Sequence, residues 1–177
     1  MKALVVYESL FGNTEQVALA ITGGLSKHGE VELIEVTDAP AVITEPFDLL
    51  VLGGPTHAFS MTRPSTREDA FKQGATQGST ALGLREWLEH LRKGPHSERV
   101  ATFDTRVAKV RHLPGSAAKS AAKLAHKLGY AAAAQSEGFY VEDVPGPLID
   151  GELSRAQAWG EQLGAQAAVR AVERGVS

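Results

Sequence analysis

Short apolar segments alternate with longer helical patterns along most of the chain, and this alternation constrains the fold more than any other feature. The first, third and fourth of five apolar segments are nearly continuous in Val, Leu and Ala, which is typical of strands buried on both faces of a parallel sheet. The pattern predicts an open, doubly wound α/β sheet. The five candidate strands span 2–7, 30–36, 48–54, 99–104 and 131–141.

Amphipathic helical patterns fill most of the intervals between these strands. Gly29 and Gly129 stand where two of the helices would end, because glycine readily adopts the left-handed backbone that closes a helix. A short helix between 37 and 45 is a weaker indication of the same kind. The main predicted helices span 14–28, 81–93, 115–128 and 152–173.

Segment 60–80 interrupts this alternation. It is polar, rich in Ser, Thr and Gly, and has no clear periodicity. We therefore predict a long loop there, and long loops in compact domains tend to be either functional or disordered.

Length and charge narrow the possible classes of protein. With 177 residues, 43% of them hydrophobic, we expect one domain comprising residues 1–177. The 18 Lys and Arg against 21 Asp and Glu give a net charge of −3, which implies neither a nucleic-acid partner nor an anionic membrane. The first apolar run is too short for a signal peptide or a membrane span, so we expect a cytoplasmic protein.

The chain contains no cysteine, which limits its chemistry. Disulfides, thiolate metal sites, cysteine nucleophiles and iron–sulfur clusters held by the chain are all excluded. His28, His90, His96 and His126 lack the spacing of metal ligands, so we expect no metal site. Any redox chemistry would need a bound cofactor.

In open α/β sheets, ligands bind outside the carboxyl ends of the strands, where the strand order reverses. This rule directs attention to segments 8–14, 53–60 and 104–114. In the first of these, a helix beginning near Thr14 would leave backbone N–H groups without partners, and nearby hydroxyl and amide side chains would add polar contacts. The segment favours a phosphate site without fixed positive charge. The alternative is a capped turn, with Ser or Thr as N-cap and Glu15 in the first helical turn.

Other phosphate-binding motifs are absent from the sequence. No G-x-G-x-x-G follows the first strand, and no G-x-x-x-x-G-K-[ST] occurs anywhere, which argues against dinucleotide-binding and P-loop proteins. A phosphorylatable receiver domain would need an acidic residue after the third strand, which instead ends in VLGGPTH.

Residues 5–21, VVYESLFGNTEQVALAI, resemble the signature with which flavodoxins bind the phosphate of FMN. The resemblance implies a flavodoxin-like three-layer α/β sandwich, with a five-stranded parallel sheet of order 2-1-3-4-5 and helices on both faces. It also implies that FMN is the cofactor. The residues expected around its phosphate are Ser9, Leu10, Phe11, Gly12, Asn13 and Thr14.

Two further segments stand where flavodoxins carry the loops that flank the isoalloxazine ring of FMN. These are GGPTHAF at 53–59 and TFDTR at 102–106. By this resemblance, the ring would be approached by Pro55, Thr56, His57, Ala58, Phe59, Asp104, Thr105 and Arg106.

Both ring loops depart from the usual flavodoxin pattern. Flavodoxins commonly stack an aromatic side chain from each loop on the ring, whereas 104–115 contains no Phe, Tyr or Trp. Ala58 stands where a flavodoxin usually has a glycine, whose freedom to adopt positive φ helps to stabilise the one-electron-reduced flavin. A net charge of −3 is also mild for an electron carrier of this family.

Several cations are expected near the mouth of this site. They either form a solvated loop surface or receive an anionic substrate, and Arg106 could also approach the flavin. The resemblance implies electron transfer with a redox partner protein. The alternative is a two-electron FMN-dependent oxidoreductase acting on a quinone or another small acceptor, with 60–80 as a lid. The cations are Arg63, Arg67, Lys72, Arg106, Lys109 and Arg111.

Overall fold

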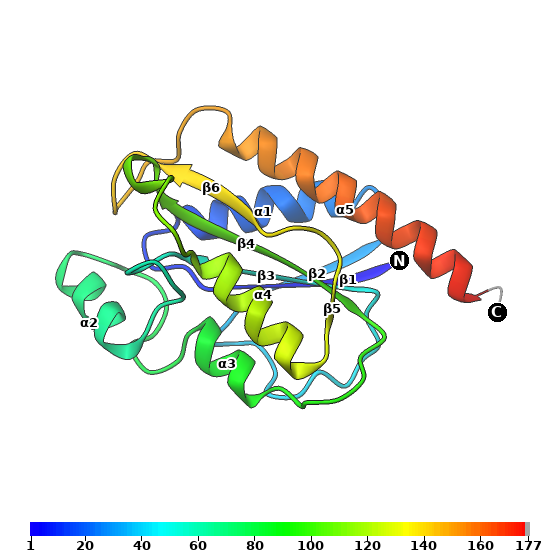
Figure 1. The fold of residues 1–177 in the computed structure, drawn as a ribbon. Helices are drawn as coiled ribbons and strands as arrows, with labels where there is room; N and C mark the ends of the chain where they lie inside the picture. The colour runs from blue at the N-terminus through cyan, green and yellow to red at the C-terminus, as the bar shows by residue number, and fades with distance from the viewer. Residues whose placement is uncertain (176–177) are drawn as a thin grey trace.

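A parallel sheet lies between two layers of helices in the computed structural model, which describes residues 1–175 (Figure 1). All strands run toward the end of the molecule where α2 lies, so the loops that follow them gather there. The elements are β1 (Lys2–Tyr7), α1 (Asn13–Leu25), β2 (Glu30–Glu35), β3 (Leu49–Pro55), α2 (Pro64–Lys72), α3 (Leu84–His90), β4 (Arg99–Val107), the 3-10 turn η1 (Ala108–Val110), α4 (Ala117–Leu128), β5 (Ala131–Ala132), β6 (Glu137–Val141) and α5 (Glu152–Gly175).

The sheet has the strand order β2-β1-β3-β4-β5, which confirms the predicted topology. The expected fifth strand is divided in two, so the sheet has six strands. β5 pairs with Arg99 and Val100 at the start of β4, and β6 pairs with β4 from Phe103 onward. Between them the chain leaves the ladder, and the Ser136 hydroxyl bonds the Thr102 hydroxyl at 2.8 Å.

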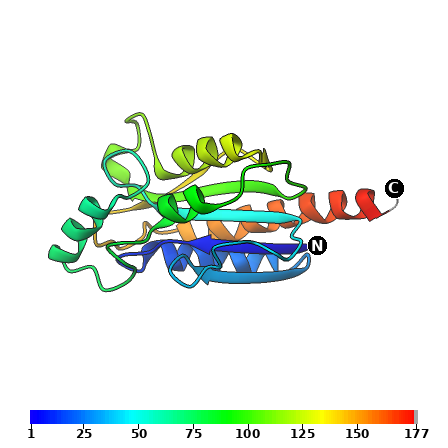
Figure 2. The ribbon, with the colours of Figure 1, turned by 90° about the horizontal axis from the view of Figure 1, so that it is seen from below.

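Alternation along the central strands divides the core between the two faces of the sheet. Leu4 and Val6 of β1 pack in a cluster with side chains of α3 and α4, such as Trp87. Val5 of β1 packs in a second cluster with side chains of α1 and α5, such as Ile21. Figure 2 shows the two helical layers with the sheet between them. The central strands are therefore buried on both faces, as their sequences predict.

A helix occupies the middle of the segment that we predicted as a loop, 60–80. Pro64 is the first residue of α2, and the Arg63 N–H donates to the Thr66 hydroxyl at 2.9 Å, which closes the first turn. The helix escaped prediction because its most deeply buried side chain is Arg67, a charged residue where an apolar one would have shown the periodicity.

Segment 37–45 contains turns and bends and no helix, contrary to the weaker indication in its sequence. Its apolar side chains Ala39 and Ile43 still pack on the α3 and α4 face of the sheet. The Trp87 indole N–H donates to the Pro40 carbonyl at 3.0 Å. This contact fixes the segment to α3 without helical hydrogen bonds.

Among residues 1–175, no helix is both long enough and apolar enough to cross a membrane.

Candidate functional site

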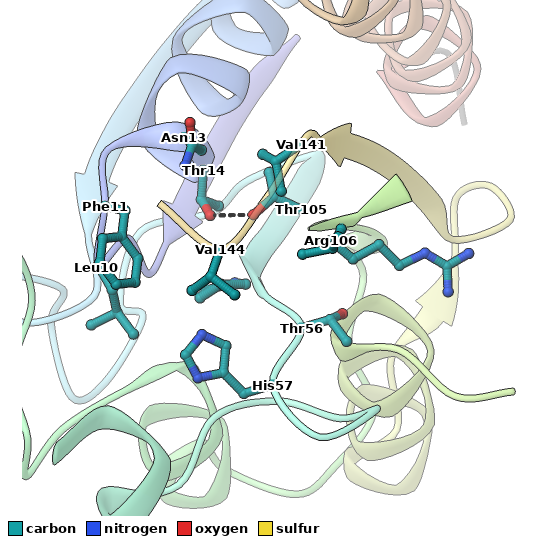
Figure 3. Close-up of a pocket in the computed structure, with 12 residues that line it drawn as sticks. Leu10, Phe11, Asn13, Thr14, Thr56, His57, Thr105, Arg106, Val141 and Val144 are labelled. Carbon is teal, nitrogen blue, oxygen red and sulfur yellow. Dashed lines mark hydrogen bonds between the residues drawn. The ribbon is translucent and has the colours of Figure 1, made fainter. Parts of the chain in front are cut away.

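A small cavity lies where four loops meet at the carboxyl ends of β1, β3, β4 and β6 (Figure 3). Its volume is about 60 Å³. Nine of the predicted site residues line it: Leu10, Phe11, Asn13, Thr14, Pro55, Thr56, His57, Thr105 and Arg106. Three lining residues were not predicted: Val107, Val141 and Val144.

Val141 is the last residue of β6, and Val144 belongs to the loop that follows it. The rule that ligands bind beyond the carboxyl ends of parallel strands applies to this strand as well. It could have identified the loop, because the predicted fifth strand ends at residue 141, where β6 also ends. The Asn13 side-chain amide donates to the Pro145 carbonyl at 3.2 Å, so this loop is tied to the start of α1.

Ser9 and Gly12 do not line the cavity, but they shape the turn that enters α1. The Ser9 hydroxyl accepts hydrogen bonds from the N–H groups of Gly12 at 3.1 Å and Glu15 at 3.4 Å. Gly12 has φ +84°, a left-handed conformation that glycine adopts without strain. The turn presents the N-terminal end of α1, with its partial positive charge, to the cavity.

Two hydroxyl groups form the polar floor of the cavity. Thr14 Oγ1 and Thr105 Oγ1 lie 2.7 Å apart and are joined by a hydrogen bond in Figure 3. One O–H donates within this pair, which leaves the other O–H to donate elsewhere. The pair can therefore supply one hydrogen bond to an acceptor in the cavity.

The nearby N-terminus of α4 is satisfied by the protein itself. Its first three N–H groups, at Ala117, Ala118 and Lys119, donate to Thr56 Oγ1 at 2.8 Å, Asp104 Oδ2 at 3.0 Å and Ser116 Oγ at 3.2 Å. Asp104 thus faces α4 and does not line the cavity, and burial raises the pKa of its carboxyl group. Of the two helix N-termini, α1 is the one suited to an anion.

Ala58 and Phe59 form a tight turn outside the cavity. Their φ angles are +46° and +64°, and paired hydrogen bonds between His57 and Ser60 close the turn at 3.0 and 3.1 Å. Phe59 is 49% exposed, and its backbone passes close to Gly115. Positive φ at two residues other than glycine is uncommon and stores strain, as is often seen at binding sites.

His57 separates this cavity from a second one of about 280 Å³. The second cavity lies between the 56–58 loop and α2, and Thr66, Asp69 and Gln73 supply its polar walls. Burial lowers the pKa of His57, against an opposing hydrogen bond to the Thr66 backbone. The imidazole is therefore neutral near pH 7 and can both donate and accept a hydrogen bond.

The guanidinium group of Arg106 points away from His57 and the cavity (Figure 3). It donates to the Arg111 carbonyl at 3.0 Å and reaches the Gly115 carbonyl at 3.5 Å. Because this group bonds backbone carbonyls and points away (Figure 3), Arg106 places no positive charge in the cavity.

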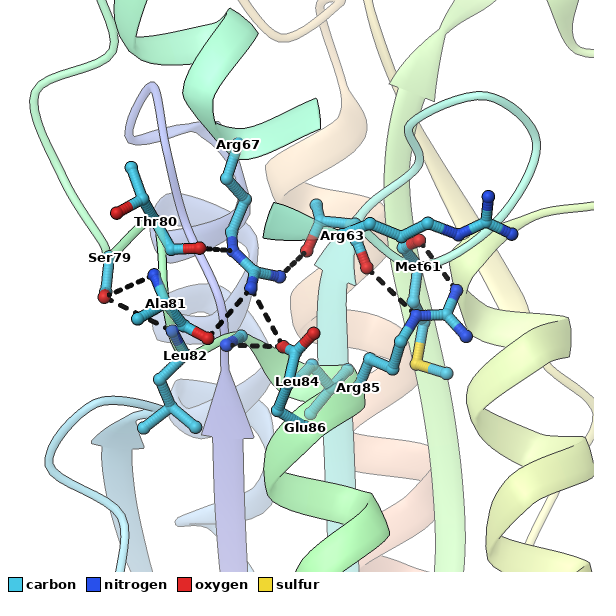
Figure 4. A network of polar contacts seen from close by, with 12 residues as sticks. Met61, Arg63, Arg67, Ser79, Thr80, Ala81, Leu82, Leu84, Arg85 and Glu86 are labelled. Carbon is cyan, nitrogen blue, oxygen red and sulfur yellow. Dashed lines mark hydrogen bonds and ion pairs between the residues drawn. The ribbon is translucent and has the colours of Figure 1, made fainter. Parts of the chain in front are cut away.

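Arg67 is fully buried, which corrects its assignment to the mouth of the site. Its guanidinium group donates to the carbonyls of Thr80 at 3.1 Å and Ala81 at 3.2 Å, and pairs with Glu86 at 3.0 Å (Figure 4). It also donates to Thr62 Oγ1 at 2.9 Å. The other predicted mouth cations on α2 and its flank, Arg63 and Lys72, are exposed, and Lys72 pairs with Asp69.

Glu8, which follows β1, completes this network and was not singled out from the sequence. It is 1% exposed and accepts hydrogen bonds from Thr62 Oγ1 at 2.6 Å and the Leu84 N–H at 2.9 Å. Burial raises the pKa of its carboxyl group. The network thereby joins the loop after β1 to α2 and α3.

No group of three or more His, Asp or Glu side chains in the described part of the chain could hold a metal ion. No protein-family model matches the sequence, and no curated protein is significantly similar to it.

Solved structures do resemble this chain. A flavodoxin from Bacillus cereus is 19% identical with a TM-score of 0.65, over 92% of this chain and 97% of the other. A flavodoxin from the domain Archaea is 20% identical with a TM-score of 0.62, over 94% of this chain and 99% of the other. A flavone reductase is 14% identical with a TM-score of 0.57, over 94% of this chain and 63% of the other. Together with the strand order and the position of the cavity, these similarities identify the architecture of this chain as the flavodoxin-like fold.

Proposed function

We propose that this protein binds FMN noncovalently and transfers electrons through it. The observation that most strongly supports this proposal is the turn at residues 9–14. This turn presents the N-terminus of α1 to a cavity that lacks a fixed cation. Neutral N–H and hydroxyl donors suit a single phosphomonoester. The resemblance of residues 5–21 to the flavodoxin signature and the similarity to solved flavodoxins support FMN as the ligand.

The chain's own residues fit the two ends of FMN differently. At the phosphate end, the first N–H groups of α1 and one hydroxyl of the Thr14–Thr105 pair would donate. Toward the ring, Phe11, Val107 and Val144 provide apolar surface that excludes water, and the neutral His57 provides a polar edge. Bound FMN would supply the reversible uptake and release of electrons.

The turn at Ala58 and Phe59 holds the backbone beside His57 in one conformation. Its positive φ angles persist without glycine because surrounding contacts fix the turn. The Ser60 hydroxyl bonds the Ser120 hydroxyl at 3.0 Å, and Arg85 donates to the same Ser60 hydroxyl at 3.1 Å. Any change of this backbone on reduction of the cofactor would have to work against these contacts.

The leading function is electron transfer to or from a redox partner protein, in the cytoplasm, by a single domain of residues 1–177. The second cavity favours an alternative function, because it offers a small acceptor a place beside His57. In that case the protein is an FMN-dependent oxidoreductase that passes two electrons to a quinone or a similar molecule.

Titration of the purified apoprotein with FMN and with riboflavin tests FMN binding. We expect FMN to bind with quenched fluorescence and a shifted visible spectrum, and riboflavin to bind at least about tenfold more weakly because it lacks the phosphate. Unchanged FMN spectra at high protein concentration would reject the proposal. Equal affinity for the two flavins would reject the phosphate site at 9–14.

A cavity-filling variant separates the two functions. Gln73→Trp would narrow the second cavity, whereas Gln16→Trp, on the exposed face of α1, is the matched control. Loss of quinone-dependent flavin reoxidation in Gln73→Trp alone would support the enzyme. Two results in the unmodified protein would support the carrier. These are slow reoxidation of the reduced flavin by the quinone and reduction of the flavin in two separate one-electron stages.

A further inference from the structure

Segment 105–136 carries an unusually one-sided charge. It contains six Lys and Arg and no Asp or Glu. Because the whole chain has a net charge of −3, the rest of the sequence carries −9. One part of the molecule therefore has a net positive charge, while the rest has a net negative charge. The positive part comprises the end of β4, η1, the following turn, α4 and β5.

The lysines of α4 form a row along its outer face. Lys119, Lys123 and Lys127 recur every four residues and are exposed, whereas alanines such as Ala121 and Ala125 are buried against the sheet. Like charges at this spacing destabilise a helix. The row of lysines therefore lowers the stability of α4.

No ion pair relieves this charge within the described residues. The salt bridges of residues 1–175 include none of Lys109, Arg111, Lys119, Lys123 or Lys127. We call these five residues the basic face. Their charges remain available to an external partner.

The basic face continues to the mouth of the candidate site. Arg111 accepts a hydrogen bond from Arg106, which lines the cavity, and the Ala117 N–H donates to Thr56, which also lines it. Three large apolar side chains on the same loops are exposed: Phe59, Val110 and Leu113. Exposed apolar side chains bordered by polar and charged ones match the apolar centre and polar rim of a protein–protein interface.

We infer that the basic face docks an acidic protein surface and brings it to the mouth of the cavity. The inference rests on the proposed function, since the partner would exchange electrons there. An acidic protein fits better than a nucleic acid or an anionic membrane. The extended negative charge of a nucleic acid or a membrane would also repel the rest of this chain, which has a net charge of −9. A folded protein can instead present a local acidic patch to the basic face alone.

An NMR titration with a strongly acidic plant-type [2Fe–2S] ferredoxin as the probe tests the inference. The chemical shifts of the backbone amides are followed in the ¹⁵N-labelled protein, once without FMN and once loaded with FMN. We expect shifts or broadening at residues 109–127, and an affinity that falls about tenfold or more between about 20 and 200 mM salt. The basic mitochondrial cytochrome c should leave this face unperturbed.

Two matched variants carry the decisive comparison. The triple variant Lys119→Gln/Lys123→Gln/Lys127→Gln should bind the ferredoxin about tenfold more weakly. The triple variant Lys2→Gln/Lys27→Gln/Arg170→Gln makes the same change of charge outside segment 105–136 and should bind as the unmodified protein does.

Equal losses in the two variants, no detectable binding, or shifts confined to other faces would overturn the inference. Tighter binding of duplex DNA or of phosphatidylglycerol vesicles to the same residues would overturn the choice of an acidic protein. The α4 lysines do not line the cavity, so the FMN affinity of both variants should be unchanged. Failure of FMN to bind therefore rejects the proposed function. The ferredoxin titration of the apoprotein does not depend on FMN, so it tests the docking surface separately.

Discussion

Arg67 illustrates how much one buried side chain determines near the candidate site. Its guanidinium group satisfies two backbone carbonyls, a hydroxyl and a carboxylate, which come from segments on both sides of α2. Lysine could not meet these acceptors together, because its single ammonium group lacks the forked geometry of arginine. The residue fixes α2, and with it the outer wall of the second cavity.

Replacing this side chain tests its structural role. We expect Arg67→Met to lower the free energy of unfolding by about 3–5 kcal/mol, because it removes the fully buried guanidinium group that pairs with Glu86 and donates to the Thr80 and Ala81 carbonyls. Urea denaturation of the apoprotein would measure the loss.

Arg63→Met is the matched control, since Arg63 is exposed and its backbone N–H, not its side chain, bonds Thr66. Its unfolding free energy should change by about 0.5 kcal/mol or less. If the two variants were equally stable, the buried network would contribute nothing to holding α2.

The sequence predicted the positions of many site residues but not what their charged groups contact. Arg67, Arg106 and Arg63 all stand near predicted ligand-binding loops in the sequence, yet Arg67 is fully buried, Arg106 bonds nearby backbone carbonyls and Arg63 is exposed. Glu8 was missed for the same reason. Burial of a charge depends on partners that come together only in the folded chain.

At the level of helices and strands, prediction succeeded where apolar periodicity is strong. The three central strands and the helices α1, α4 and α5 lie close to their predicted ranges because their buried positions are apolar. Prediction was wrong for α2, whose most deeply buried side chain is an arginine. It was also wrong for 37–45, where apolar residues pack on the sheet through turns.

Packing between α1 and α5 depends on two facing glycines. A Cβ at Gly24 would lie 2.1 Å from the Gln157 carbonyl oxygen, and a Cβ at Gly160 would lie 2.2 Å from the Ile21 carbonyl oxygen. The obstacles are backbone atoms, which cannot turn aside as a flexible side chain can. The two helices approach closely only because both positions lack a side chain.

Two adjacent substitutions in α1 separate this packing from helix propensity. Gly24→Ala should destabilise the protein by about 2 kcal/mol or more, because the helices must move apart. Gly23→Ala has open space around its Cβ and should stabilise α1 by about 0.5–1 kcal/mol. Thermal unfolding of both variants measures the contrast, and equal effects of one sign would contradict the close contact.

For the molecule as a whole, the candidate site is a product of topology. Its four loops follow β1, β3, β4 and β6 and are far apart in the sequence, but parallel strands bring them to one end of the sheet. The first loop could be recognised from its local motif. Val141 and Val144 have no such motif, and they reach the cavity because β6 pairs with β4.

This convergence predicts how a bound flavin should stabilise the fold. FMN at about 100 times its Kd should raise the free energy of unfolding by about 2.7 kcal/mol, and amides that exchange by global unfolding should slow by about 100-fold. Riboflavin at the same multiple of its own Kd should give equal global stabilisation. The difference between the two flavins should be local, at residues 9–14, where only FMN brings a phosphate.

Hydrogen exchange followed by mass spectrometry distinguishes these effects. Additional protection by FMN over riboflavin should appear at 9–14 and extend to 142–147, because the Asn13 side chain bonds the Pro145 carbonyl. Asn13→Ala should remove the extension to 142–147 and retain the protection at 9–14, since the phosphate donors there are backbone groups. Identical exchange at 9–14 with both flavins would mean that the phosphate lies elsewhere, and the turn at Ser9 and Gly12 would then serve only to begin α1.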